Sequence, residues 1–368
     1  MGALAGQLLE HAAEPLDRIR TTLYKLSARV PPLRRLMGKR DHRVTFVATA
    51  HAFVAFTFAV ALPTFLLAIG PVLLGVAHVV ADLRYLVMRR GLPRVWLAII
   101  AAACVTLIAL RGADELGLGR LAVARAEHAV VTAWIAVALC FGAATSRRWG
   151  RIAVGLAVLS GLGVVAQTHP YLTRLVYAHL HNLVALVLWL ALFRSQLRAA
   201  ALPLAVIVLM TLILSSGRTY FITERLGTTD VFGLHVLAAA DWLAPGLSFF
   251  PAVGLTLSFA FLQSVHYSTW LLVIPQEDVR GPGTSTYRRF ARALLREFGQ
   301  AGVALIVIGT FGVVVLAFFG LARARNLYLS LAMFHGYVEL ALGAYFFTRG
   351  GFAPLAPPAP AITARLAA

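Results

Sequence analysis

About ten runs of apolar residues, separated by short charged or polar segments, divide this 368-residue chain. Each run is close to the length of about 20 residues that a helix needs to cross a bilayer core. Without water there, every backbone N–H and C=O must bond within the chain, which permits only helices or closed barrels. Alternating barrel strands are not visible, so we expect an all-α, polytopic membrane helical bundle. The expected spans are residues 45–67, 70–88, 95–111, 127–144, 152–167, 175–193, 201–215, 250–274, 300–320 and 327–347.

The formal net charge of +18 does not indicate nucleic-acid binding, because the basic residues are distributed by loop. Lys and Arg gather before the first expected span and in every second loop, whereas the intervening loops are nearly neutral or mix signs. Cytoplasmic loops of membrane proteins concentrate positive charge. The pattern predicts an even number of spans, cytoplasmic N and C termini, and a bacterial-type inner (plasma) membrane.

Three regions follow from this pattern. Residues 1–44 are basic and amphipathic, and either lie on the inner membrane surface or anchor the topology. Residues 45–347 form the transmembrane domain. Residues 348–368 are rich in Pro and Ala and are expected to be disordered.

Two of the connections between spans are long enough to hold structure of their own. Residues 216–249 contain a helix expected at the outer interface or re-entering the membrane. In residues 275–299, Ser285 or Thr286 is expected to cap a basic amphipathic helix.

Two expected spans carry a histidine followed four residues later by a carboxylate. These are His78 with Asp82 in the second span, and His335 with Glu339 in the tenth. Residues four apart share one helix face, and a rise of about 1.5 Å per residue places both histidines near mid-bilayer. Ionisable side chains at that depth are costly and usually face the protein interior. Both pairs are therefore candidate functional groups.

Three further histidines lie in spans of the same direction. His266 is in the eighth span, whereas His179 and His181 are two apart in the sixth, so at most one of these two joins a common site. A bundle that brings such faces together builds a metal site in its core. Imidazole and carboxylate suit iron, with zinc or manganese possible. The predicted metal ligands are His78, His179 or His181, His266 and His335, and the predicted catalytic carboxylates are Asp82 and Glu339, which would bridge, ligate or orient.

Simpler roles stand beside these. A single membrane histidine more often forms a hydrogen bond between helices, which is the interpretation for His51. Asp82 has Arg84 and Arg89 nearby for an ion pair. The remaining polar and aromatic neighbours either line a pocket or pack: Gln263, Tyr267, Trp270 and Tyr337.

The segment GVAHVVAD, from Gly75 to Asp82, resembles the Brp/Blh family of bacterial and archaeal β-carotene dioxygenases, polytopic proteins that hold iron through histidines and split β-carotene with O2 into retinal. The family pattern is G-x-P-H-G-x-x-D, and this chain has Ala77 and Val79 at the Pro and second Gly. A later family segment has two histidines four apart. Here FAFLQSVHYSTW supplies His266, with Trp270 at the second position, which His335 or His179 would have to replace. The resemblance implies that His78 and His266 are iron ligands.

We therefore expect an intramembrane, metal-dependent enzyme, a non-haem iron oxygenase or oxidase acting on a lipid, isoprenoid or carotenoid. Its partners would be the bilayer and a hydrophobic small molecule that enters from it. One alternative is a haem-b electron carrier with paired axial histidines. The other is a proton-coupled transporter in which histidines and carboxylates form a relay.

Overall fold

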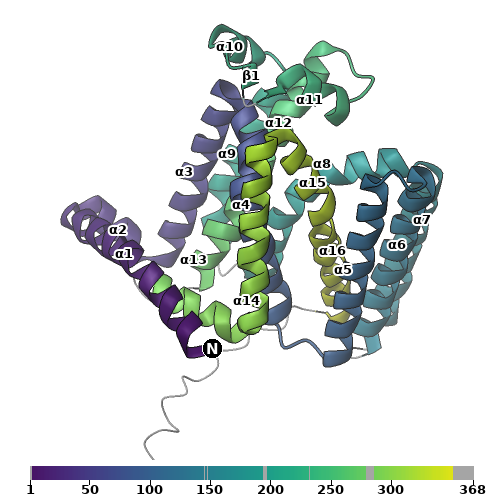
Figure 1. Cartoon of the computed structure of the whole chain (residues 1–368), viewed down its shortest axis with the longest axis horizontal. Helices are drawn as coiled ribbons and strands as arrows, with labels where there is room; N and C mark the ends of the chain where they lie inside the picture. Colours follow the sequence, from purple (N-terminus) through teal and green to yellow (C-terminus); the bar gives the residue numbers. More distant parts are fainter. Residues whose placement is uncertain are drawn as a thin grey trace, which may run out of the picture. The chain divides into compact units, whose positions relative to one another are not determined.

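The computed structural model describes residues 2–144, 146, 148–193, 197–231, 233–278 and 286–350, and almost all of them are helical (Figure 1). Among these described residues, ten helices are long and apolar enough to cross a membrane, which confirms the all-α prediction and indicates an integral membrane protein. Most of the tail expected at 348–368 lies outside the described residues. The chain divides into two compact units, residues 1–80 with 171–332, and residues 81–170 with 333–368.

The first unit holds most of the helices. Its elements are α1 (Gly2–Arg29), α2 (Pro31–Gly38), α3 (Arg40–Ala61), η1 (Phe65–Ile69), most of α4 (Gly70–Leu83), α8 (Pro170–Leu188), η3 (Trp189–Phe193), α9 (Leu197–Ser215), α10 (Tyr220–Arg225), β1 (Asp230–Val231), β2 (Leu234–His235), α11 (Val236–Leu243), α12 (Phe249–Ser268), η4 (Thr269–Val273), α13 (Ile274–Asp278), α14 (Tyr287–Phe319) and α15 (Leu321–Ala332).

The core of this unit is α12, which packs on α3 and α9 and buries most of its side chains. The close approach of α12 to α9 depends on Gly254 of α12. A Cβ added at this position would lie 2.7 Å from the backbone carbon of Ser215 on α9. Small residues at such crossings let membrane helices pack by their backbones. His51 of α3 makes the predicted interhelical contact, because its Nε2 lies 3.2 Å from the Ser264 carbonyl oxygen of α12.

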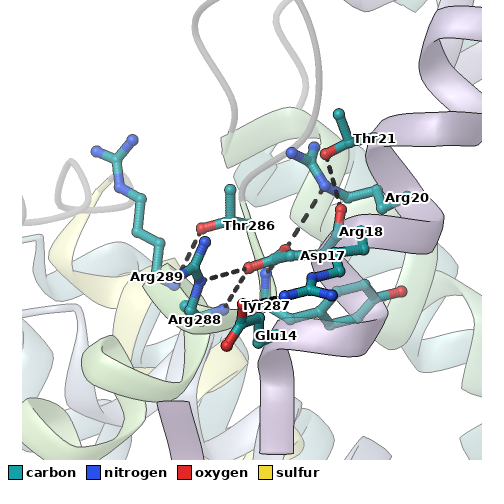
Figure 2. Close-up of polar contacts among 9 residues, drawn as sticks. All are labelled: Glu14, Asp17, Arg18, Arg20, Thr21, Thr286, Tyr287, Arg288 and Arg289. Atoms are coloured by element: carbon teal, nitrogen blue, oxygen red, sulfur yellow. Dashed lines mark hydrogen bonds and ion pairs between the residues drawn. The ribbon is translucent and has the colours of Figure 1, made fainter. Parts of the chain in front are cut away.

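Helix α1 docks on the start of α14 through one carboxylate (Figure 2). Asp17 accepts hydrogen bonds from the backbone N–H groups of Tyr287 (2.7 Å) and Arg288 (3.2 Å), two donors that a helix start leaves without partners. The Arg288 side chain also donates to Asp17, at 3.3 Å. Asp17, which is 270 positions from Tyr287 in the sequence, thus provides partners for two N–H groups at the start of α14.

Thr286 is the N-cap residue of α14, because its Oγ1 accepts a hydrogen bond from the Arg289 N–H at 3.1 Å. This confirms one of the two predicted caps, and Ser285 lies outside the described residues. Gly299, at φ 70°, kinks α14 between its basic amphipathic start and the apolar stretch beyond. A positive φ favours glycine at that position.

The connection 216–249 folds into α10, the two short strands β1 and β2, and α11. The predicted helix is confirmed as α11, whose N-cap His235 accepts a hydrogen bond from the Leu237 N–H at 3.1 Å. The β1–β2 pair was not predicted, since two-residue strands carry no detectable alternation. In Figure 1, α10 and α11 lie at one end of this unit, and α1 and α2 lie toward the other.

The second unit is a smaller bundle. It contains η2 (Arg84–Met88), α5 (Arg94–Glu115), α6 (Arg120–Ala144), α7 (Trp149–Thr168) and α16 (Phe334–Arg349), with α16 packed on α5, α6 and α7. At Gly142 an added Cβ would lie 3.1 Å from the backbone carbon of Tyr345, so α6 and α16 also meet by a small residue.

Several helices are longer than the spans expected from hydropathy. The span expected at 127–144 begins at Arg120, and that at 175–193 begins at Pro170. The span expected at 327–347 is two helices, α15 and α16, which meet at Met333. The apolar runs marked the part suited to lipid, whereas backbone hydrogen bonding continues into polar flanks.

Candidate metal centre

Three histidines from three helices of the first unit gather into one cluster, which we call the histidine cluster: His78 of α4, His181 of α8 and His266 of α12. The ring centroids of His181 and His266 are 4.4 Å apart, and those of His78 and His266 are 5.3 Å apart. All three side chains are buried. His266 has a ring nitrogen within 4.8 Å of one of His78, and a ring nitrogen within 4.8 Å of one of His181.

All three helices that carry the histidine cluster run directly into π-helical turns. Segment η1 precedes α4 and η2 follows it, η3 follows α8, and η4 follows α12. Along the described residues, π-helix occurs only on these three helices. A π turn inserts one residue into the 3.6 period and rotates the faces on either side of it, and such turns are frequent at functional sites. On these three helices, the π turns therefore rotate the helix ends relative to the faces that carry the buried histidines.

Local contacts orient His78. Its Nδ1 lies 3.4 Å from the Leu74 carbonyl oxygen one turn earlier, and because a carbonyl can only accept, that nitrogen donates. In a neutral imidazole the lone pair then resides on Nε2, the atom that binds metals. The Tyr267 ring packs against His78 with centroids 4.3 Å apart. Tyr267, expected from sequence only as a neighbour, therefore forms one wall of the histidine cluster.

The two histidines of α8 separate as their spacing requires. His181 joins the cluster, whereas the Nε2 of His179 lies 2.8 Å from the Leu243 carbonyl oxygen of α11 and its ring meets the edge of Phe259. The structure therefore does not bring His179 to the cluster. Its hydrogen bond ties α8 to α11.

The remaining predicted site residues belong to the second unit. His335 and Glu339 of α16 are buried, and so is Asp82, one turn beyond His78 on α4. Asp82 lies within electrostatic range of Glu339. Neither carboxylate oxygen of Asp82 accepts a hydrogen bond from any residue that the structure describes, so the ion pair considered with Arg84 is not formed there. The role of His335 and Glu339 in the metal site stays a prediction.

The second unit also contains a buried polar network that the sequence did not reveal. Arg111 Nη2 of α5 pairs with Glu127 Oε1 of α6 at 2.7 Å, and the Tyr337 hydroxyl of α16 donates to the same oxygen at 2.7 Å. Glu127 is fully buried. The sequence did carry one signal for this ion pair. Arg111 ends one expected span and Glu127 begins the next, so the two opposite charges lie at neighbouring ends of antiparallel helices. Tyr337 thus bonds within this network.

The spacing of His266 to each of its two neighbours, His78 and His181, fits a pair of ligands to one metal ion. Imidazoles bound to one ion at about 2.1 Å, at roughly tetrahedral or octahedral angles, have ring centroids about 5 Å apart. The measured 4.4 and 5.3 Å lie on either side of this value. Neutral imidazole ligands of this kind suit iron, zinc, copper or nickel.

Comparison with known proteins adds no assignment. No protein-family model matches the chain, and no curated protein and no solved structure is significantly similar to it.

Proposed function

We propose that this protein is an intramembrane, metal-dependent oxidoreductase, a non-haem iron oxygenase or oxidase that acts on an apolar lipid or isoprenoid. The observation that carries the proposal is the convergence of His78, His181 and His266, from three apolar helices, into one buried cluster. A single imidazole on a membrane helix is more often a hydrogen-bonding group, whereas several buried together indicate function. Two pairs at ligand spacing that share His266 are better explained by a bound ion than by three separate hydrogen bonds.

The histidines would hold the ion, with His78 bound through Nε2 while Leu74 fixes its ring. A bound iron would supply oxygen activation and electron transfer, which no side chain provides on its own. The chain's own contribution is the dry, apolar surrounding of the cluster and the orientation of its rings. The choice of iron and of an isoprenoid substrate draws on the resemblance of the Gly75–Asp82 segment to the β-carotene dioxygenases.

The spacing of His266 to His78 and to His181 favours a non-haem ion over haem b for these two pairs. Two axial imidazoles on opposite faces of a haem have ring centroids more than about 6 Å apart, since each nitrogen lies about 2 Å from the iron. Both measured pairs in the histidine cluster are closer than this. A transporter relay needs no such convergence of three imidazoles.

The proposed topology follows the basic loops. The faces that carry α1, α2 and the start of α14 would lie in the cytoplasm together with both termini, and α10 and α11 would lie outside. An apolar substrate would enter this site sideways from the lipid of a bacterial-type plasma membrane.

Oxygen uptake by purified protein in nanodiscs tests the proposal. Iron-loaded protein supplied with a polyprenyl or carotenoid lipid should consume O2 and incorporate label from ¹⁸O₂ or water into product, and His266→Ala should abolish this. His179→Ala is the matched control, because that ring bonds to Leu243 and should leave uptake intact. A Soret band in the active preparation, or uptake that persists in His266→Ala, would refute the proposal.

A further inference from the structure

Arg325 of α15 places a buried guanidinium in the first unit with no anionic partner among the described residues. Its side chain is 1% exposed. Its Nε donates to the Leu67 carbonyl oxygen at 2.6 Å, its Nη1 donates to Asn326 Oδ1 at 2.8 Å, and its guanidinium carbon lies 4.7 Å from the Trp242 ring centroid. No described carboxylate pairs with it, and its Nη2 donates to no described residue.

A structural role accounts for only part of this arrangement. The bond to Leu67 stabilises a carbonyl of the π-helical segment η1, and the Trp242 ring screens one face of the cation. Neither contact uses Nη2 or neutralises the charge. An uncompensated buried cation is costly, and in membrane proteins such residues are usually functional.

A second buried donor lies one turn further along the same face of α15. Tyr328 is 8% exposed, and its hydroxyl has no hydrogen-bond partner among the described residues. Its ring fills the space above Gly75 of α4, one turn before His78. Tyr267, which packs on His78, lies within electrostatic range of both Arg325 and Tyr328. Arg325 and Tyr328 thus connect to the histidine cluster through Tyr267.

We propose that Arg325 and Tyr328 bind the anionic oxygen group, a carboxylate or a phosphate, of an amphipathic substrate whose apolar part reaches the histidine cluster. This rests on the proposed function and adds that the substrate carries a negative charge at one end. Guanidinium suits such groups because its planar fork donates to two oxygens. The partly exposed Trp242 marks the end of the unit, near α11, at which the charged group would lie.

Binding of a charged and an uncharged lipid of equal length tests this without requiring turnover. Full-length protein in nanodiscs is titrated with palmitate, hexadecanol, phosphatidic acid and inorganic phosphate. Palmitate or phosphatidic acid should bind about 10- to 100-fold more tightly than hexadecanol, the range expected for hydrogen bonds to a charged group. Arg325→Gln should remove this preference, and Arg325→Lys should retain part of it. The two lipids separate a free carboxylate from a phospholipid head group, and tight binding of phosphate alone would overturn the amphipathic ligand.

Tyr328→Phe keeps the ring above Gly75 and removes only the hydroxyl, so it remains informative if Arg325→Gln fails to fold. It should weaken palmitate several-fold and leave hexadecanol unchanged. Equal affinities for acid and alcohol in the unaltered protein, or an unchanged preference in both variants, would overturn the proposal. Repeating the titration with His266→Ala separates the two proposals. Anion preference that persists without metal supports this site independently, and metal binding without anion preference refutes this site alone.

Discussion

Gly75→Ala is the substitution whose effect can be worked out most directly. A Cβ at this position would lie 2.5 Å from Cε1 and 2.6 Å from the hydroxyl oxygen of Tyr328, whereas ordinary contacts begin near 3.4 Å. The buried Tyr328 ring, or the α4 backbone, must therefore move by about 1 Å. Overpacking of this kind costs about 1–3 kcal/mol, which is a roughly 5- to 150-fold shift in the folding equilibrium.

The same displacement should reach the histidine cluster. Gly75 and His78 are three residues apart and share a face of α4, so backbone movement at one shifts the other. We expect metal affinity to fall by about tenfold, comparable to the loss of an orienting partner.

Reversible unfolding in mixed SDS micelles and a metal-chelator competition measure these two effects. Gly70→Ala is the matched control, since a Cβ there would meet only Tyr267 Cε2, at an ordinary 3.8 Å. Combining Gly75→Ala with Tyr328→Leu should restore most of the lost stability, because the smaller side chain leaves room for the methyl group. If Gly75→Ala and Gly70→Ala unfold alike, the packing argument is wrong.

Three further predictions concern other parts of the molecule. Glu127→Ala should destabilise the protein by about 3–5 kcal/mol in the same unfolding assay, because it leaves Arg111 without its buried partner. Tyr337→Phe should cost about 1.5–3 kcal/mol, the value of one hydrogen bond to a charged group, and an effect equal to that of Glu127→Ala would contradict the network. Although burial acts to raise it, hydrogen bonds from Tyr287 and Arg288 lower the pKa of Asp17. A lowered folded-state pKa stabilises docking of α1 above the unfolded value of about 3.9, and docking is lost as pH falls through the folded pKa. Proteolysis of α1 should therefore accelerate below about pH 4, and Asp17→Asn should accelerate it already at neutral pH.

The sequence predicted those features that repeat along the chain. Ten apolar runs predicted ten helices because lipid permits few other structures. The spacing of His179 and His181 predicted that at most one of them could join a shared site, and Thr286 was one of the two caps expected before the helix at 287.

Features that depend on contacts distant in sequence were not predictable. Which of the two histidines of α8 faces inward depends on the Leu243 carbonyl, 64 residues from His179. The ion pair of Arg111 and Glu127 was missed because both residues fall at the limits of expected spans. Arg325 was missed for the same reason, since the tenth span was expected to begin at residue 327.

Metal analysis of the purified protein tests the central claim most directly. Elemental analysis after gentle detergent extraction should find about one iron, or another ligand-compatible transition metal, per chain. His78→Ala, His181→Ala and His266→Ala should each lose that metal, whereas His179→Ala should retain it. Metal-free protein after reconstitution with ferrous iron, or equal metal content in all four variants, would contradict a metal centre at the histidine cluster.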